Sequence, residues 1–192
     1  LSPCLEMYAM ILACARVGVI FSIIDESMGT DTLGYIFNDA APCAILTDSD
    51  NASFYEQISH DGVGLVFVTG STSTSVFKSE ILVDVELCNH EKDFDTQLFH
   101  PDTPLFIAYV SGSNSGPKGV VHSHRIMMGT YASAKYVLDL HQDSILWSDA
   151  DPSSMVGVVY GVFAPWLCGA TTVTLCIPFS ASACYLTLER LS

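Results

Sequence analysis

LFIAYVSGSNSGPKGVVHSH, residues 105–124, joins a strand-like run to a loop of small residues. Leu105 to Val110 are apolar, aromatic and β-branched, which predicts a buried strand. Ser111 to Gly119 follow at once, and they combine glycines and hydroxyl side chains with a single lysine, Lys118. Glycines let the backbone come close to a ligand, N–H and hydroxyl groups donate to phosphate oxygens, and a lysine adds positive charge. The pattern therefore predicts a loop that binds the phosphates of a nucleotide.

This loop differs from the Walker A loop, which needs a serine or threonine after its lysine, because Gly119 follows Lys118. A second interpretation is that a loop rich in serine and glycine is only a flexible connector. The strand before the loop and the sequence PKGVVHSH after it favour the binding interpretation.

Strand-like and helix-like runs alternate on either side of the loop. Such alternation is typical of an α/β fold with mostly parallel sheet layers flanked by helices. Gly18 suits the end of a first helix, and Thr30 or Asp31 suits the start of a second. The predicted helices span 1–17, 30–39, 52–60 and 131–138, and the predicted strands span 19–24, 44–47, 65–69, 105–110 and 145–147.

The charge balance limits the possible partners. The 192 residues include 7 Lys and Arg against 21 Asp and Glu, a net charge of −14, so we expect no nucleic-acid partner. The seven cysteines are odd in number and form no C-x-x-C pair, which argues against a disulfide framework and against a zinc site. Buried free thiols in a reducing compartment, the cytoplasm, are the expectation.

Two apolar runs, Leu5–Ile24 and Val156–Phe179, could be mistaken for membrane spans. The first contains Glu6 and Arg16, and the second is interrupted by glycines and prolines and ends in a β-prone sequence. We therefore expect no membrane span, and we expect the second run to form a buried helix, a turn and a strand.

Other polar segments carry weaker signals. Residues 70–75, GSTSTS, lack a lysine and are expected to form a surface loop. The acidic range 76–102 predicts a solvated linker, with acid–base or calcium-binding carboxylates as the alternative. His122 and His124 could bind a metal, but no partner ligand is spaced nearby, so no metal site is predicted. A role in loop geometry or a hydrogen bond near the nucleotide is favoured instead.

Residues 109–120 resemble the phosphate-loop signature of the adenylate-forming superfamily, [YT]-T-S-G-[ST]-T-G-x-P-K-G-V. The matching residues are Tyr109, Ser111, Gly112, Ser113, Pro117, Lys118, Gly119 and Val120. Residues 150–173 are similar to the acetyl-CoA synthetase type, also called acetate–CoA ligase. The matching residues there are Ala150, Asp151, Gly157, Tyr160, Gly161, Val162, Phe163, Pro165, Trp166, Leu167, Gly169, Ala170, Thr171 and Val173.

The resemblance implies a fold, a reaction and a set of site residues. The fold is a partial N-terminal AMP-binding domain over 1–192, with the first βα units in 1–75, the acidic linker in 76–102 and the phosphate-loop and acyl/CoA-pocket region in 103–192. The reaction activates acetate or propionate with ATP and Mg²⁺ and then transfers the acyl group to CoA. The implied phosphate ligands are Ser111, Gly112, Ser113, Asn114, Ser115, Gly116 and the catalytic Lys118, and the implied pocket residues are Met155 and Val156.

Three alternatives stay open. The sequence begins with Leu1, ends at Ser192 within a helical pattern and lacks the family's later Y-G-x-T-E motif, so we expect a fragment that is inactive by itself. A medium-chain acyl-CoA synthetase or a peptide-synthetase adenylation domain is a second possibility. A decayed relative that at most binds nucleotide is a third, because Asn114, Ser115, Ser153 and Ser154 replace residues usual in the family.

Overall fold

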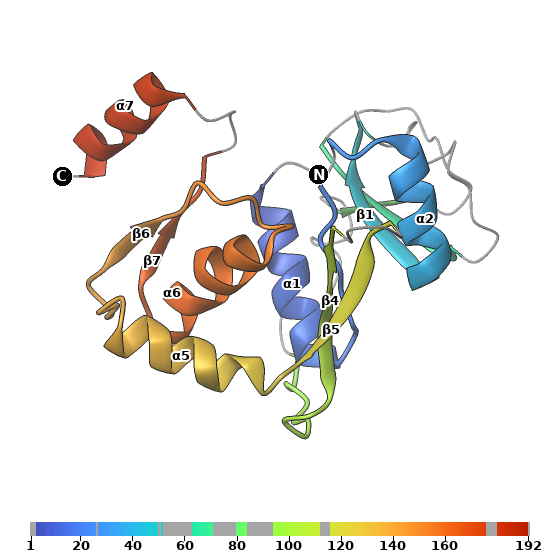
Figure 1. Cartoon of the computed structure of the whole chain (residues 1–192), viewed down its shortest axis with the longest axis horizontal. Coiled ribbons are helices and arrows are strands. Elements are labelled where there is room, and N and C mark those ends of the chain that lie inside the picture. Colours follow the sequence, from blue (N-terminus) through green and yellow to red (C-terminus); the bar gives the residue numbers. More distant parts are fainter. Residues whose placement is uncertain are drawn as a thin grey trace.

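The computed structural model describes residues 3–25, 27–49, 51, 63–70, 80–83, 94–111, 116–175 and 180–191. Its elements confirm the predicted α/β class. In chain order they are α1 (Leu5–Val17), α2 (Thr30–Ala40), β1 (Ala44–Asp48), β2 (Leu65–Thr69), β3 (Glu80–Leu82), β4 (Pro104–Val110), β5 (Lys118–Ser123), α5 (Ile126–Tyr136), β6 (Ile145–Trp147), η1 (Gly157–Phe163), α6 (Ala164–Leu167), β7 (Thr171–Val173) and α7 (Ala181–Leu191). Helix α7 lies at one end of the molecule and α2 with β1 at the other, with α1, β4 and β5 between them (Figure 1).

The described strands form three small sheets. Strands β1, β2 and β3 are parallel neighbours, and β6 pairs with β7 in the same sense. Strands β4 and β5 instead form an antiparallel hairpin. The segment between β4 and β5 is shorter than the dozen residues that a parallel crossover needs, so an antiparallel pair is the arrangement this connection permits.

The strand predicted at 19–24 is wrong as a regular element. Phe21 forms a single parallel bridge to Phe106, in which the Phe21 N–H donates to the Leu105 carbonyl and the Phe21 carbonyl accepts from the Ile107 N–H. At the next position the Ser22 hydroxyl donates to the Ile107 carbonyl over 2.8 Å. A side chain thus occupies the acceptor that a continuing ladder would use, and the pairing with β4 stops.

Three other segments refine the sequence predictions. Glu80–Leu82, inside the range predicted as a solvated linker, form β3 and pair with β2, so these three residues belong to a sheet. Helix α5 begins five residues earlier than predicted, directly after β5. The predicted helix at 52–60 and residues 71–75 of the predicted surface loop lie outside the described residues.

The main core lies between α1, β4 and η1. It is built around Met7, Ile11, Phe106, Val162 and Phe163, each no more than 7% exposed. Phe106 stacks on Phe21 with ring centres 5.6 Å apart. This packing buries one face of the hairpin, so the loop at its end is held by a rigid base.

The apolar run 156–179 forms η1, α6 and β7 in its described part, which confirms the predicted order of helix, turn and strand. Gly18 also ends α1 as predicted, with φ of 76°. Within the described ranges, no helix combines the length and the apolar composition needed to cross a bilayer.

Candidate nucleotide and acyl site

The phosphate loop predicted from the sequence lies at the closed end of the β4–β5 hairpin. Val110, the last residue of β4, pairs with Lys118, the first residue of β5. Ser111 and Lys118 are both exposed, and they stand at the two ends of the loop. Gly112, Ser113, Asn114 and Ser115 lie outside the described residues. The hairpin therefore brings the first and last predicted phosphate ligands to the same edge.

Gly116 gives the loop a backbone conformation that other residues adopt at a cost. Its φ is 78°, in the left-handed region. A Cβ atom on Gly116 would lie 3.7 Å from the Tyr35 ring, in ordinary contact. The family signature has its glycine at the position of Ser115, and in this chain the neighbouring Gly116 supplies a left-handed turn.

Two residues of α2 that were not predicted from the sequence, Tyr35 and Asp39, lie beside the ends of this loop. The Tyr109 hydroxyl donates to the Asp39 carboxylate over 2.8 Å. Burial, followed by this hydrogen bond, raises the pKa of Tyr109 well above its usual range. The only sequence signal was the spacing of four residues between Tyr35 and Asp39, which places both side chains on one helix face.

A second part of the candidate site is a cavity of about 610 Å³ beside β5, α5 and the start of η1. Met155 and Val156, the predicted pocket residues, both line it, and Val156 is 60% exposed. The remaining wall is mainly apolar, with a few polar groups. The lining residues are Val121, His122, Ser123, Arg125, Ile126, Gly129, Thr130, Met155, Val156, Val159 and Tyr160.

Met155 and Val156 are placed by a tight turn before η1. The Ser154 hydroxyl donates to the Asp151 carbonyl over 2.7 Å and accepts from the Gly157 N–H over 3.0 Å. A Cβ atom on Gly157 would lie 1.9 Å from the Asp151 carbonyl oxygen, so only glycine fits there. Ser154, which replaces a residue usual in the family, thus binds both ends of the turn. The helix that follows has π geometry, a form frequent at functional sites.

The two histidines after the loop pack against different aromatic residues. His122 stacks on Phe106 with ring centres 4.8 Å apart and faces the cavity, while His124 stacks on Phe99 at 5.5 Å. The described residues contain no group of three His, Cys, Asp or Glu side chains that could hold a metal ion. The Asp39 carboxylate beside the loop already accepts the Tyr109 hydroxyl. Mg²⁺, which the resemblance implies, is usually held by one or two carboxylates together with substrate phosphates, so it does not require three protein ligands.

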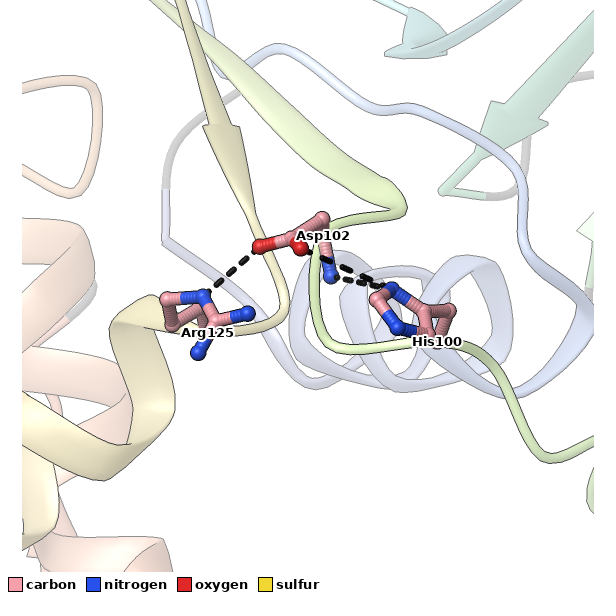
Figure 2. A network of polar contacts seen from close by, with 3 residues as sticks. All are labelled: His100, Asp102 and Arg125. Carbon is pink, nitrogen blue, oxygen red and sulfur yellow. Dashed lines mark hydrogen bonds and ion pairs between the residues drawn. The ribbon is translucent and has the colours of Figure 1, made fainter.

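The open end of the hairpin is fixed by a polar network of His100, Asp102 and Arg125 (Figure 2). Arg125, directly before α5, donates through Nε to the Asp102 carboxylate over 2.7 Å. The Arg125 N–H also donates to the Pro101 carbonyl over 2.7 Å. These contacts join the residues before β4 to the residues after β5, so the hairpin is held at the end opposite the phosphate loop.

This network predicts a pH dependence. The hydrogen bond from Arg125 holds the pKa of Asp102 below its usual range. A lowered carboxyl pKa stabilises the fold above the unfolded value of about 4, and the stabilisation is lost as the pH falls through the folded value. We expect urea unfolding to show a lower free energy of unfolding for Asp102→Asn at neutral pH, and the difference from the unaltered protein to shrink as the pH falls below the unfolded value and through the folded one. Asp143→Asn, which removes an exposed carboxylate before β6, is the control; a difference that stays constant with pH would contradict the assignment.

The fold is similar to that of solved structures that include an acyl-CoA synthetase and an anthranilate CoA ligase. An acyl-CoA synthetase from Brucella canis superposes with a TM-score of 0.90 at 23% sequence identity, over 99% of this chain and 34% of that chain. An anthranilate CoA ligase in complex with anthranoyl-AMP superposes with a TM-score of 0.87 at 18% identity, over 100% of this chain and 36% of that chain. At these identities the likeness defines the fold, an α/β unit that is found in acyl-CoA ligases.

Sequence comparison then gives the family. The profile of the AMP-binding enzymes matches residues 1–191, and the chain belongs to the AMP-binding enzyme family. It is 32% identical to an acetyl-coenzyme A synthetase of Bacillus subtilis over 190 residues, which are 97% of this chain and 32% of the relative. It is 27% identical to an acetyl-coenzyme A synthetase of Helicobacter pylori over 187 residues, 88% of this chain and 28% of the relative. The chain thus spans about a third of the length of the curated relatives it matches.

Proposed function

We propose that this chain forms the ATP-phosphate and acyl-binding part of an acid–CoA ligase that activates acetate or propionate. The observation that carries the proposal is the position of β5. Lys118 at its first residue ends the phosphate loop, and His122 and Ser123 at its other end line the cavity that holds Met155 and Val156. One short strand therefore connects the two candidate binding regions.

In the proposed first step, a carboxylate oxygen attacks the α-phosphorus of ATP, the bond to the bridging oxygen breaks, and pyrophosphate leaves. In the second step the CoA thiol attacks the acyl carbon and AMP leaves. Neither step requires a protein nucleophile, so the chain acts by orienting reactants and stabilising charge. Lys118 and the loop residues Ser111 to Gly116 hold the β- and γ-phosphates, and Met155 and Val156 contact the acyl group or the CoA thiol arm.

The mainly apolar lining of the cavity supports an apolar acyl group. Val156 stands where the family has a threonine, so one hydroxyl that would approach CoA is lost. We expect Val156→Thr to raise kcat/KM for CoA by about 2- to 12-fold, because a typical hydrogen bond contributes about 0.5–1.5 kcal/mol. The matched control is Val120→Thr, the same change in β5 outside the cavity lining. An equal effect of both substitutions on kcat/KM for CoA would show that Val156 does not contact CoA.

ATP–pyrophosphate exchange in the natural polypeptide that carries this chain tests the proposal. Acetate or propionate is expected to support the fastest exchange in a panel that also contains medium-chain acids and amino acids. Preference for a medium-chain acid or an amino acid would assign the chain to one of the other adenylating classes. Absence of exchange with every acid would favour the decayed relative, for which replacing Asn114 with threonine and Ser115 with glycine is expected to restore activity.

We further propose a cytoplasmic location, which the odd number of scattered cysteines supports. The isolated 192 residues are proposed not to turn over, since the family's later motif is absent from them. Exchange by the isolated chain at the rate of the natural polypeptide would contradict that part of the proposal.

A further inference from the structure

Among the described residues, one face of α2 lies beside both ends of the phosphate loop. Helix α2 lies beside the end of the hairpin at which β5 begins (Figure 1). Tyr35 and Asp39 are four residues apart on α2, so their side chains project from the same face. Asp39 accepts the Tyr109 hydroxyl, and the Tyr35 ring faces Gly116, where an added Cβ atom would lie 3.7 Å from it.

These two contacts fall on opposite sides of the loop. Tyr109 is the second-last residue of β4, just before Ser111, and Gly116 lies two residues before Lys118. One helix face thus binds the side chain of a residue before the loop and faces a glycine near its other end. Movement of α2 would move both ends of the loop together.

The Tyr109 ring also connects this helix to the lysine-bearing strand. Tyr109 pairs with Gly119 in the hairpin register. A Cβ atom on Gly119 would lie 3.2 Å from the tip of the Tyr109 ring and 3.1 Å from Ile107. The ring therefore passes closely over Gly119, the residue after Lys118, on its way to Asp39.

Helix α2 is itself firmly held, which a positioning role requires. Its opposite face buries Leu33, Ile36 and Phe37, with exposed fractions of 0%, 2% and 7%. Tyr109 stays a hydrogen-bond donor over the neutral pH range, because burial and the Asp39 carboxylate raise its pKa. The hydrogen bond from Tyr109 to Asp39 is therefore present at the neutral pH at which an ATP-dependent enzyme works.

We propose that Tyr35 and Asp39 of α2 are positioning residues for ATP binding, which act through Gly116 and Tyr109 on either side of the phosphate loop. The inference rests on the proposed function, since it assumes that the loop binds ATP. These residues act through the flanks of the loop and do not line the acyl cavity, so their loss affects ATP and leaves the cavity unchanged. A contact that only stabilised the fold would affect both substrates alike or neither.

The test is steady-state kinetics of ATP–pyrophosphate exchange in the natural polypeptide, with KM measured separately for ATP and for the acid. Tyr109→Phe and Asp39→Ala are each expected to raise KM for ATP by about 2- to 12-fold, the effect of one typical hydrogen bond, without changing KM for the acid. Asp39→Asn keeps an oxygen that accepts from Tyr109 and is expected to stay within about twofold of the unaltered protein. Tyr109→Phe and Asp39→Ala remove the same hydrogen bond. The double variant is therefore expected to raise KM for ATP by the same factor as either single variant.

The matched control is Tyr8→Phe. Tyr8 on α1 shares a hydrogen bond of the same length, 2.8 Å, with Thr174 and lies away from the loop. Its removal is expected to leave both KM values unchanged. Equal rises in KM for ATP and for the acid, or an unchanged KM for ATP in Tyr109→Phe, would overturn the positioning role while leaving the proposed function intact. Absence of exchange by the unaltered protein would overturn both.

Discussion

Lys118→Ala is expected to lower kcat/KM for ATP by about 10- to 150-fold in the natural polypeptide. The reason is the loss of a hydrogen bond from a charged group to a phosphate oxygen, which contributes about 1.5–3 kcal/mol. Lys118 is exposed at the end of the loop, so the truncation removes little packing. Steady-state rates of ATP–pyrophosphate exchange measure the effect, and the kcat/KM for the acid at saturating ATP is expected to change much less.

The control for this substitution is Lys135→Ala. Lys135 is an exposed lysine of α5 whose Nζ donates to the Tyr131 hydroxyl over 3.0 Å. Both substitutions change the net charge of −14 by the same amount. Equal losses in the two variants would indicate a general charge effect and would remove Lys118 from the phosphate site. Lys118→Arg is expected to retain part of the activity, because it keeps the charge with a different geometry.

Gly157→Ala is expected to lower the free energy of unfolding by about 3 kcal/mol, the upper end of the usual cost of overpacking a buried site. The added methyl group would lie 1.9 Å from the Asp151 carbonyl oxygen and 2.4 Å from its carbon atom, and both are backbone atoms that cannot rotate away. Relief requires the turn before η1 to open. Met155 and Val156 lie on that turn, so the exchange activity is expected to fall with the stability.

Gly34→Ala makes the same chemical change, but it is expected to raise the free energy of unfolding. Gly34 lies within α2, and an added Cβ atom there would meet nothing within 4 Å. Alanine in a helix interior is favoured over glycine by about 0.5–1 kcal/mol, so this variant is expected to unfold at higher urea concentration. Urea unfolding of both variants checks the pair. A Gly157→Ala protein as stable as Gly34→Ala would show that the turn at Asp151 is not tightly packed.

Local sequence patterns predicted much of this fold. The strands at 65–69 and 145–147 and the end of α1 at Gly18 were confirmed, because short apolar β-branched runs and a C-terminal glycine act within a few residues. The segment 19–24 has the same β-branched composition and yet forms one bridge, since a strand also requires a partner with free backbone groups. Glu80–Leu82 were not predicted as a strand and yet form one, because a short strand at a sheet edge needs little local signal.

The same distinction between local and long-range signals applies to the candidate site. The phosphate loop is contiguous in sequence, so its residue types and spacing could be recognised directly. Tyr35 and Asp39 lie some 70 residues before the loop they contact, as the separation of Asp39 and Tyr109 shows. Nothing in the local sequence of α2 specifies that its exposed face meets a hairpin. The hydrogen bonds of Ser154 were equally hidden, because they depend on the backbone path from Asp151 to Gly157.

Hydrogen exchange of the natural polypeptide, measured by mass spectrometry, tests the proposed phosphate site most directly. The peptide that covers residues 109–120 is compared with ATP, with inorganic pyrophosphate and with AMP at saturating concentrations. We predict slower exchange in this peptide with ATP and with pyrophosphate and no change with AMP, since the backbone N–H groups of the loop would bind the β- and γ-phosphates. Unchanged exchange of this peptide in the presence of bound ATP would contradict the account.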